Sequence, residues 1–122
     1  MSTKTIITQF NNRNEFLELL KVNPGLIIVK FGAKWCGPCK QIHSLVEQSF
    51  RGMPDNVLCA DIDIDENFDV YTFLKSKRMI NGVPTIFCYT NDDDSFVPSF
   101  SVVGGNIQRV QEFFNLCIEN LK

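Results

Sequence analysis

The strongest constraint on the fold of this chain is a pair of short apolar runs, residues 26–31 and residues 57–64, on either side of a helical pattern. Runs of this length that are rich in β-favouring residues are typical of buried strands. Residues 40–50, between them, carry apolar side chains at helical spacing, namely Ile42, Leu45, Val46 and Phe50. The sequence therefore predicts a strand, a helix and a second strand in that order.

Two weaker patterns precede this unit. Residues 5–8 are predicted to form a short strand. Asn14 is predicted to cap a helix over residues 15–22, which ends at the Asn-Pro-Gly sequence of residues 23–25.

Three further elements are predicted after residue 64. A helix over residues 68–77 presents an apolar face that consists of Phe68, Tyr71 and Leu74. Residues 85–89 and 96–102 flank an acidic turn at residues 91–95 and are predicted to form a hairpin. A last helix follows a Gly-Gly pair, and its apolar stripe consists of Ile107, Val110, Phe114, Cys117, Ile118 and Leu121.

Strands that alternate with helices, followed by a hairpin and a helix, predict an α/β fold with a central mixed β-sheet and helices on both faces. The chain has 122 residues, of which 44% are hydrophobic and 11 are Phe. This is enough for one domain, residues 1–122, with a packed core. No internal repeat or linker divides the sequence.

The charge pattern argues against two classes of partner. With 12 Lys and Arg residues against 14 Asp and Glu residues, the chain lacks a basic field for nucleic acid or a membrane surface. Its longest wholly apolar run, residues 26–29, is far shorter than the ~20 residues that cross a bilayer. Residues 1–14 are polar and lack the apolar core of a secretory signal. We therefore expect a cytoplasmic protein, and we expect it to be a monomer.

Two cysteines, Cys36 and Cys39, lie where the first apolar run gives way to the following helix. Backbone N–H groups and the macrodipole at a helix N-terminus favour a thiolate, so Cys36 is predicted to be the nucleophile. Cys39, one turn further in, is predicted to lose more solvent and to act as the resolving thiol. Gly37 is expected to allow a close approach of the turn, and Pro38 fits the first helical turn.

A Cys pair at this spacing is also half of a zinc site, which needs four ligands. No second such pair and no closely spaced His pair follows, so no metal site is predicted. Cys59 and Cys88 lie in apolar strand segments and Cys117 lies on the last helix, where a free Cys usually acts as a small buried hydrophobe. His43 is predicted to be an exposed polar residue rather than a base.

Residues 31–40, with the sequence Phe-Gly-Ala-Lys-Trp-Cys-Gly-Pro-Cys-Lys, resemble the active-site segment of the thioredoxin family. Three further pieces follow in that family's order: Asp-Ile-Asp-Glu-Asn at residues 63–67, Gly-Val-Pro-Thr at 82–85 and Val-Gly at 103–104. The resemblance covers nearly the whole chain and implies the thioredoxin fold. It also implies that the peptide bond before Pro84 is cis and that Pro84 packs against the two cysteines.

The resemblance further implies how a partner would dock. An extended target peptide would pair with the backbone of Val83 as an added strand. A shallow apolar rim would accept many peptide sequences, and its expected members are Trp35, Ile80, Val83, Pro84 and Gly104.

The activity that the resemblance implies is that of a protein-disulfide reductase. Cys36 would attack a disulfide in a target protein and Cys39 would release the reduced target, with no metal or bound cofactor. The Gly-Pro dipeptide between the cysteines resembles the reducing members of the family. The implied partners are disulfide-containing proteins and a reductase that recycles the dithiol, namely thioredoxin reductase. The alternative is a binding or redox-sensing subunit of a larger assembly that uses the same fold without turnover.

The chain departs from the family pattern beside the dithiol. Lys30 stands where the family usually has a buried Asp, and Asp61 stands where it usually has a Lys. If both are buried they form a pair, and Asp61 or Lys30 accepts the proton of Cys39 through a water. Alternatively, Lys30 extends into solvent and remains unpaired. Gly32 and Ser44 replace a common aromatic residue and a common Pro.

A second departure lies between residues 67 and 80, which exceed the usual pattern by about one helical turn. This places Lys75, Lys77 and Arg78 near the active end. The basic cluster is either a selector of acidic partners or a solvated helix face.

Overall fold

The computed structural model describes residues 4–92 and 94–121, and within them it contains five strands and four helices. The strands are β1 (Ile6–Ile7), β2 (Leu26–Gly32), β3 (Val57–Asp63), β4 (Thr85–Thr90) and β5 (Phe100–Val103). The helices are α1 (Arg13–Lys21), α2 (Gly37–Arg51), α3 (Phe68–Ser76) and α4 (Ile107–Glu119). The predicted α/β fold is confirmed.

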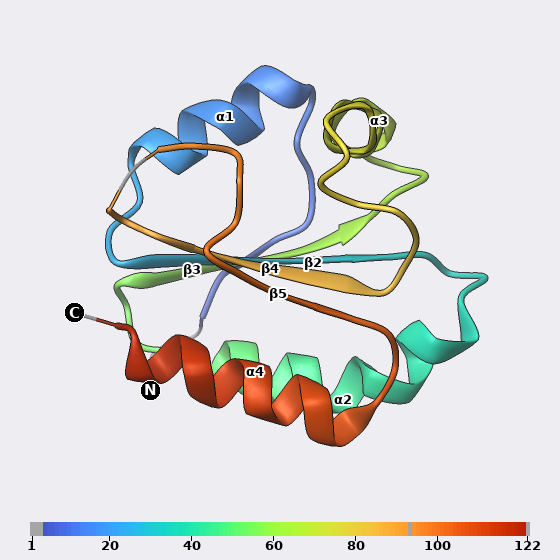
Figure 1. Ribbon diagram of the computed structural model, residues 1–122, viewed down its shortest axis with the longest axis vertical. Coiled ribbons are helices and arrows are strands. Elements are labelled where there is room, and N and C mark those ends of the chain that lie inside the picture. Colours follow the sequence, from blue (N-terminus) through green and yellow to red (C-terminus); the bar gives the residue numbers. More distant parts are fainter. Residues whose placement is uncertain (1–3, 93, 122) are drawn as a thin grey trace.

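The strands form one mixed sheet in the order β1-β3-β2-β4-β5. β3 pairs in parallel with both β1 and β2, whereas β4 pairs antiparallel with β2 and β5. Figure 1 shows the sheet nearly edge-on, with α1 and α3 on one face and α2 and α4 on the other. The sheet is therefore the middle of three layers, and β2 lies at its centre.

β2 is buried along its whole length because helices cover both of its faces. Successive side chains of a strand point to opposite faces, so Ile27, Val29 and Phe31 enter the core under α1 and α3. Leu26 and Ile28 enter the second core, under α2 and α4. Lys30 continues this second row, where an apolar side chain is expected.

The predicted start of the first helix is wrong by two residues. Asn12, not Asn14, is the N-cap of α1, because its extended backbone lets its side-chain oxygen accept a hydrogen bond of 3.1 Å from Glu15 N. This start turns Phe16 and Leu20 toward the core. The helix predicted over residues 40–50 likewise begins earlier, at Gly37, because Cys36 caps it.

Two predicted helix faces also differ from the observed ones. Phe68 is 65% exposed, and α3 instead buries Val70, Phe73 and Leu74. On α4, the predicted stripe members Ile107 and Ile118 are about half exposed, and the buried residues are Val110, Phe113, Phe114 and Cys117. Both helices carry more apolar residues than one face can hold, so spacing alone does not select the buried set.

The hairpin forms, but its second strand is shorter than the predicted 96–102. Pro98 cannot donate a hydrogen bond to the β-ladder, and β5 begins only at Phe100. Phe96 instead packs against the α1 and α3 core, and its carbonyl accepts a hydrogen bond from Tyr89 Oη at 2.9 Å.

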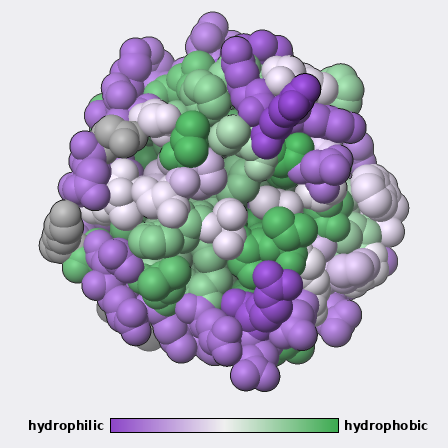
Figure 2. Space-filling model, in the orientation of Figure 1, coloured by the Kyte–Doolittle hydropathy of each residue, from purple (hydrophilic) through white to green (hydrophobic). Residues whose placement is uncertain are grey.

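Figure 2 shows apolar side chains across the middle of the face on which the sheet edge lies, with polar side chains around them. Val97 and Val103 contribute to the exposed apolar surface, since each is about half exposed. Within residues 4–92 and 94–121, no helix has both the length and the apolar content needed to cross a bilayer.

Candidate active site

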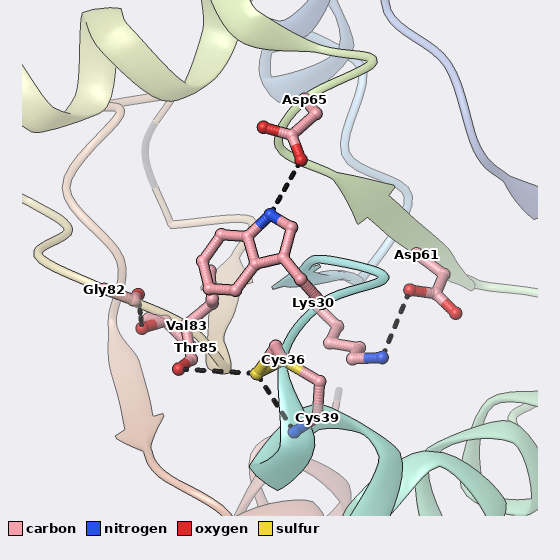
Figure 3. The surroundings of a disulfide bond; sticks show 9 residues. Lys30, Cys36, Cys39, Asp61, Asp65, Gly82, Val83 and Thr85 are labelled. Atoms are coloured by element: carbon pink, nitrogen blue, oxygen red, sulfur yellow. Dashed lines mark hydrogen bonds and ion pairs between the residues drawn. A yellow bond between two sulfur atoms is a disulfide. The ribbon is translucent and has the colours of Figure 1, made fainter.

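The two cysteines lie at the N-terminus of α2, just after the carboxyl end of β2. Cys36 is the N-cap residue and Cys39 lies in the first turn, which brings their Cα atoms to 5.3 Å. The sulfur atoms are bonded to each other, so the structure is that of the oxidised protein (Figure 3). A helix N-terminus therefore supplies the spacing that a dithiol needs in order to close a ring.

The position of Cys36 also favours its thiolate. The backbone N–H of Cys39 donates a hydrogen bond of 3.1 Å to Cys36 Sγ. This donor and the positive end of the helix dipole would both stabilise negative charge on that sulfur in the reduced protein. The expected difference in burial is not observed in the oxidised state, because the ring encloses both residues and each is 4% exposed.

A loop from the start of β4 faces the disulfide. The Val83–Pro84 peptide bond is cis, as the resemblance implied, and the carbonyl oxygen of Val83 lies 3.7 Å from Cys36 Sγ. The Pro84 carbonyl accepts a hydrogen bond of 2.9 Å from the N–H of Gly104, whose φ of +100° suits glycine. The residues just before β4 and just after β5 thus come together at the active site.

The expected apolar rim is only partly present. Trp35 is 67% exposed, and Val83 and Gly104 are half-buried. Ile80 and Pro84 were also predicted as rim residues, but both are buried. Ile80 is 3% exposed because it packs into the core under α1 and α3.

The indole of Trp35 has a partner that the sequence did not reveal. Its Nε1–H donates a hydrogen bond of 2.9 Å to Asp65, which follows β3 (Figure 3). The position of Asp65 just beyond the carboxyl end of a strand beside β2 is the signal that would have found it. The contact holds an exposed aromatic ring next to the disulfide.

The close backbone approach predicted at Gly37 occurs elsewhere. A Cβ atom on Gly37 would have no neighbour within 4 Å, because this residue faces open space. A Cβ atom on Gly105 would instead lie 2.9 Å from Pro38 Cβ. Residue 105, in the segment that leads into α4, must therefore be glycine, because it passes close to Pro38 in the active-site turn.

Lys30 and Asp61 form an ion pair in which the positions of the two charges are exchanged relative to the family pattern. They are partners in the β2 and β3 register, and Lys30 Nζ lies 3.5 Å from Asp61 Oδ1 (Figure 3). Lys30 is 5% exposed, so its side chain does not extend outward into bulk solvent. Gly32 gives this side chain room, since a Cβ atom there would lie 3.3 Å from Lys30 Cε. Ser44 is exposed, and α2 continues through it to Arg51.

The other cysteines and the histidine have the predicted environments. Cys59, Cys88 and Cys117 are free and buried. Burial raises the pKa of the Cys59 thiol to about 12, and a hydrogen bond to Cys88 together with burial raises the pKa of Cys117. His43 is exposed and lies 3.3 Å from Glu47. The described residues contain no cluster of three metal-ligating side chains.

Two members of the basic cluster lie over aromatic rings of α3. Lys75 Nζ lies 5.9 Å from the ring centre of Tyr71, and Lys77 Nζ lies 5.8 Å from that of Phe73. These contacts fit a solvated helix face, and the selection of acidic partners stays a prediction.

A reduced Cys36–Cys39 pair can give two electrons to another disulfide and close its own bond. The fold and the site therefore define the class of thiol–disulfide oxidoreductases. A sequence profile of the thioredoxin family matches residues 7–113, so the chain belongs to the thioredoxin family.

Individual relatives agree with this assignment. A thioredoxin of Ophiophagus hannah is 38% identical over 99 residues, which are 78% of this chain and 82% of that protein. Thioredoxin-1 of Saccharomyces cerevisiae is 30% identical over 110 residues, with 88% and 94% covered. The mitochondrial thioredoxin of Mus musculus is 30% identical over 100 residues, and the match takes in 79% of this chain but 58% of that protein.

Solved structures show the same fold. The thioredoxin of Trichomonas vaginalis aligns with a TM-score of 0.73 at 21% identity, covering 91% of this chain and 96% of that structure. Thioredoxin f from spinach chloroplast aligns with a TM-score of 0.72 at 20% identity, covering 97% and 98%.

Proposed function

We propose that this protein reduces disulfide bonds in target proteins. The Cys36 thiolate attacks one sulfur of a target disulfide, and the other target sulfur leaves as a thiolate that takes up a proton. The Cys39 thiolate then attacks Cys36 Sγ, which releases the second target thiolate. The two electrons come from the dithiol, and the product on this chain is the Cys36–Cys39 disulfide.

The single observation that carries this proposal is the hydrogen bond from Cys39 N to Cys36 Sγ at the start of α2. This hydrogen bond shows that the nucleophile Cys36 and the resolving residue Cys39 lie in the same first turn of α2. In the disulfide-bonded protein, Cys36 still caps α2 and Cys39 lies in its first turn.

We propose that the target docks as an extended strand beside Val83. Pro84 lacks an N–H that would compete for the sulfurs, and the Val83 carbonyl lies 3.7 Å from Cys36 Sγ. The exposed ring of Trp35 would cover the apolar side chains of the target. Contacts through the backbone and one aromatic ring fit a broad set of peptide sequences.

The partners and the location follow as further proposals. Turnover requires a donor of two electrons, and we propose a thioredoxin reductase.

Three free cysteines suit a reducing compartment, which supports a cytoplasmic location. We propose that the protein acts as a monomer, which sedimentation of the reduced and oxidised forms would test.

The test is reduction of insulin by catalytic amounts of the protein with dithiothreitol as the electron source. We expect many turnovers from the wild type, none from Cys36→Ser, and a trapped mixed disulfide from Cys39→Ser. One stoichiometric reaction of the wild type followed by arrest would contradict the reductase and favour a redox-sensing subunit. Replacement of dithiothreitol by a reductase and its nicotinamide cofactor then tests the proposed electron donor.

A further inference from the structure

A pocket of about 400 Å³ lies beside the resolving cysteine. Its walls include Cys39 from α2, Lys30 and Gly32 from β2, and Asp61 from β3. Further charged or titratable side chains line it, namely Lys34, Lys40, His43, Asp63 and Glu66. Solvent can therefore reach the neighbourhood of the sulfur that must lose a proton during the reaction.

The strand register places Lys30 at this pocket. Lys30 follows Leu26 and Ile28 in the row of side chains that faces α2 and α4. Its partner in the register is Asp61, and the two side chains form an ion pair at 3.5 Å. The Lys30 side chain is 6% exposed and that of Asp61 is 34% exposed, so the cation is the more enclosed of the two charges.

Gly32 brings this cation close to the resolving sulfur. A Cβ atom on Gly32 would lie 3.4 Å from Lys30 Nζ and also 3.4 Å from Cys39 Sγ. The ammonium and the sulfur therefore face the same small space, which a larger residue would fill. The ammonium and the sulfur are therefore no more than about 6.8 Å apart, and a positive charge near a thiol favours its thiolate.

We propose that Lys30 is a positioning and electrostatic residue for the exchange reaction, whose ammonium favours the thiolate of Cys39. Asp61, 3.5 Å from the Lys30 ammonium, partly offsets its field. Neither residue then needs to accept the proton of Cys39, which passes to water in the pocket. This assignment replaces the expectation of a proton acceptor, and it rests on the proposed function.

The other charged groups around the pocket are expected to affect the Cys39 thiolate less than Lys30 does. Lys34, Lys40 and His43 are exposed, and solvent screens their charges. Lys34 also lies 3.2 Å from Glu66. Asp63 accepts hydrogen bonds from the backbone N–H groups of Asp65 and Glu66. Lys30 is the enclosed cation of this set.

The first test measures thiolate formation at Cys39 directly. In the reduced Cys36→Ser variant, the absorbance of the Cys39 thiolate at about 240 nm is followed as a function of pH. We expect Lys30→Met to raise the titration midpoint by ~1 pH unit or more. Lys34→Met, the matched control at the pocket rim, removes the same charge and should shift the midpoint much less. An equal shift for both variants, or none for Lys30→Met, would overturn the proposal.

The second test separates a charge effect from a proton acceptor. A mixed disulfide is formed between Cys36 and thionitrobenzoate, and its release by Cys39 is timed at about pH 6, below the ordinary thiol pKa. We expect release to slow about tenfold in Lys30→Met, in line with a one-unit shift. Asp61→Asn should speed release, because it removes a negative charge near the thiolate. Slower release in Asp61→Asn would identify Asp61 as the acceptor and contradict our assignment.

Asp61→Asn changes few atoms at a half-exposed site, so it decides the question even if Lys30→Met does not fold. Both tests are independent of target turnover. Failure of insulin reduction by the wild type would reject the proposed function, whereas unchanged ionisation of Cys39 would reject the role of Lys30 alone.

Discussion

At the scale of single residues, the active-site turn depends on Gly105, because a larger side chain there would collide with Pro38. The Cα, Cβ and carbonyl oxygen of Pro38 lie 3.1, 2.9 and 3.0 Å from where a Cβ atom of Gly105 would be. Two of these three atoms are backbone and one belongs to a rigid ring, so none can move aside cheaply. Pro38 lies between the two cysteines, and any shift would alter their spacing.

We therefore expect Gly105→Ala to lower both stability and activity. Overpacking of this kind costs ~1 to 3 kcal/mol, which urea denaturation would measure together with the rate of insulin reduction. Gly37→Ala is the matched control, because a Cβ atom there meets nothing within 4 Å. Equal effects of the two substitutions would show that the contact with Pro38 is unimportant.

Residue roles could be predicted from the sequence where chemistry and spacing are local. Cys36 and Cys39 are three positions apart at the start of a helix, and their pairing required no knowledge of the fold. Gly105 and Asp65 could not be found in this way, because each meets the active-site turn from a distant part of the chain. Lys30 and Asp61 were found through the family resemblance, and their pairing became certain only with the β2 and β3 register.

At the scale of elements, the start of α1 depends on which of two nearby asparagines caps it. Asn12 Oδ1 accepts a hydrogen bond from Glu15 N, whereas Asn14 lies within the helix and is exposed. We expect Asn12→Ala to lower the free energy of unfolding by ~1 kcal/mol, and Asn14→Ala to change it much less. Chemical denaturation of both variants would measure this, and the reverse order would restore the cap predicted from the sequence.

Contacts between α1 and α3 give the stability a dependence on pH. Arg13 donates to Asp69 from its backbone N, Nε and Nη2, at 2.7, 3.0 and 2.6 Å. These hydrogen bonds, the side-chain ones first, lower the pKa of Asp69 in the folded protein. A lowered pKa contributes stability that is fully present above the unfolded-state value and is lost as the pH falls through the folded-state value.

We therefore expect Asp69→Asn to be less stable than the wild type at neutral pH. The difference should shrink below about pH 4, the ordinary Asp value, and disappear in stronger acid. Urea denaturation across this pH range would measure it. Asp55→Asn, at an exposed position, changes the same charge and serves as the control. A deficit of Asp69→Asn that persists unchanged in acid would rule out the ion pair as its cause.

Elements were predicted well where one physical signal dominates. β2 and β3 are short, apolar and buried, and their observed bounds differ from the predicted ones by one residue at the carboxyl end. Helix faces were harder, because Phe68 and Phe73 are equally apolar and only packing against the sheet and Phe96 selects Phe73. The hairpin was harder still, since Phe96 leaves the strand to join a core on the helical layer.

At the scale of the whole molecule, the core between the sheet and helices α2 and α4 keeps three cysteines away from the disulfide site. Cys59, Cys88 and Cys117 are buried in the layer between the sheet and α2 and α4, and burial raises the pKa of Cys59 to about 12. Their sequence context predicted this, because each lies among apolar neighbours. The molecule thus separates the reactive thiols at the start of α2 from inert ones in its core.

We expect an excess of Ellman's reagent to react quickly with two thiols of the reduced native protein. The three buried thiols should react only at the rate of unfolding, and quickly once denaturant is added. A double variant, Cys36→Ser with Cys39→Ser, should lose the fast phase entirely. A third fast thiol in the native wild type would show that one of the buried cysteines is open to exchange.

The proposed chemistry requires that the start of α2 makes Cys36 an unusually acidic thiol. The most direct measurement is the rate of Cys36 alkylation by iodoacetamide in the reduced protein as a function of pH, with the modified site located by peptide mass analysis. We expect selective alkylation of Cys36 with a midpoint well below the ~8.5 of an ordinary cysteine. A midpoint at or above that value, with Cys36 no faster than a free cysteine, would contradict it.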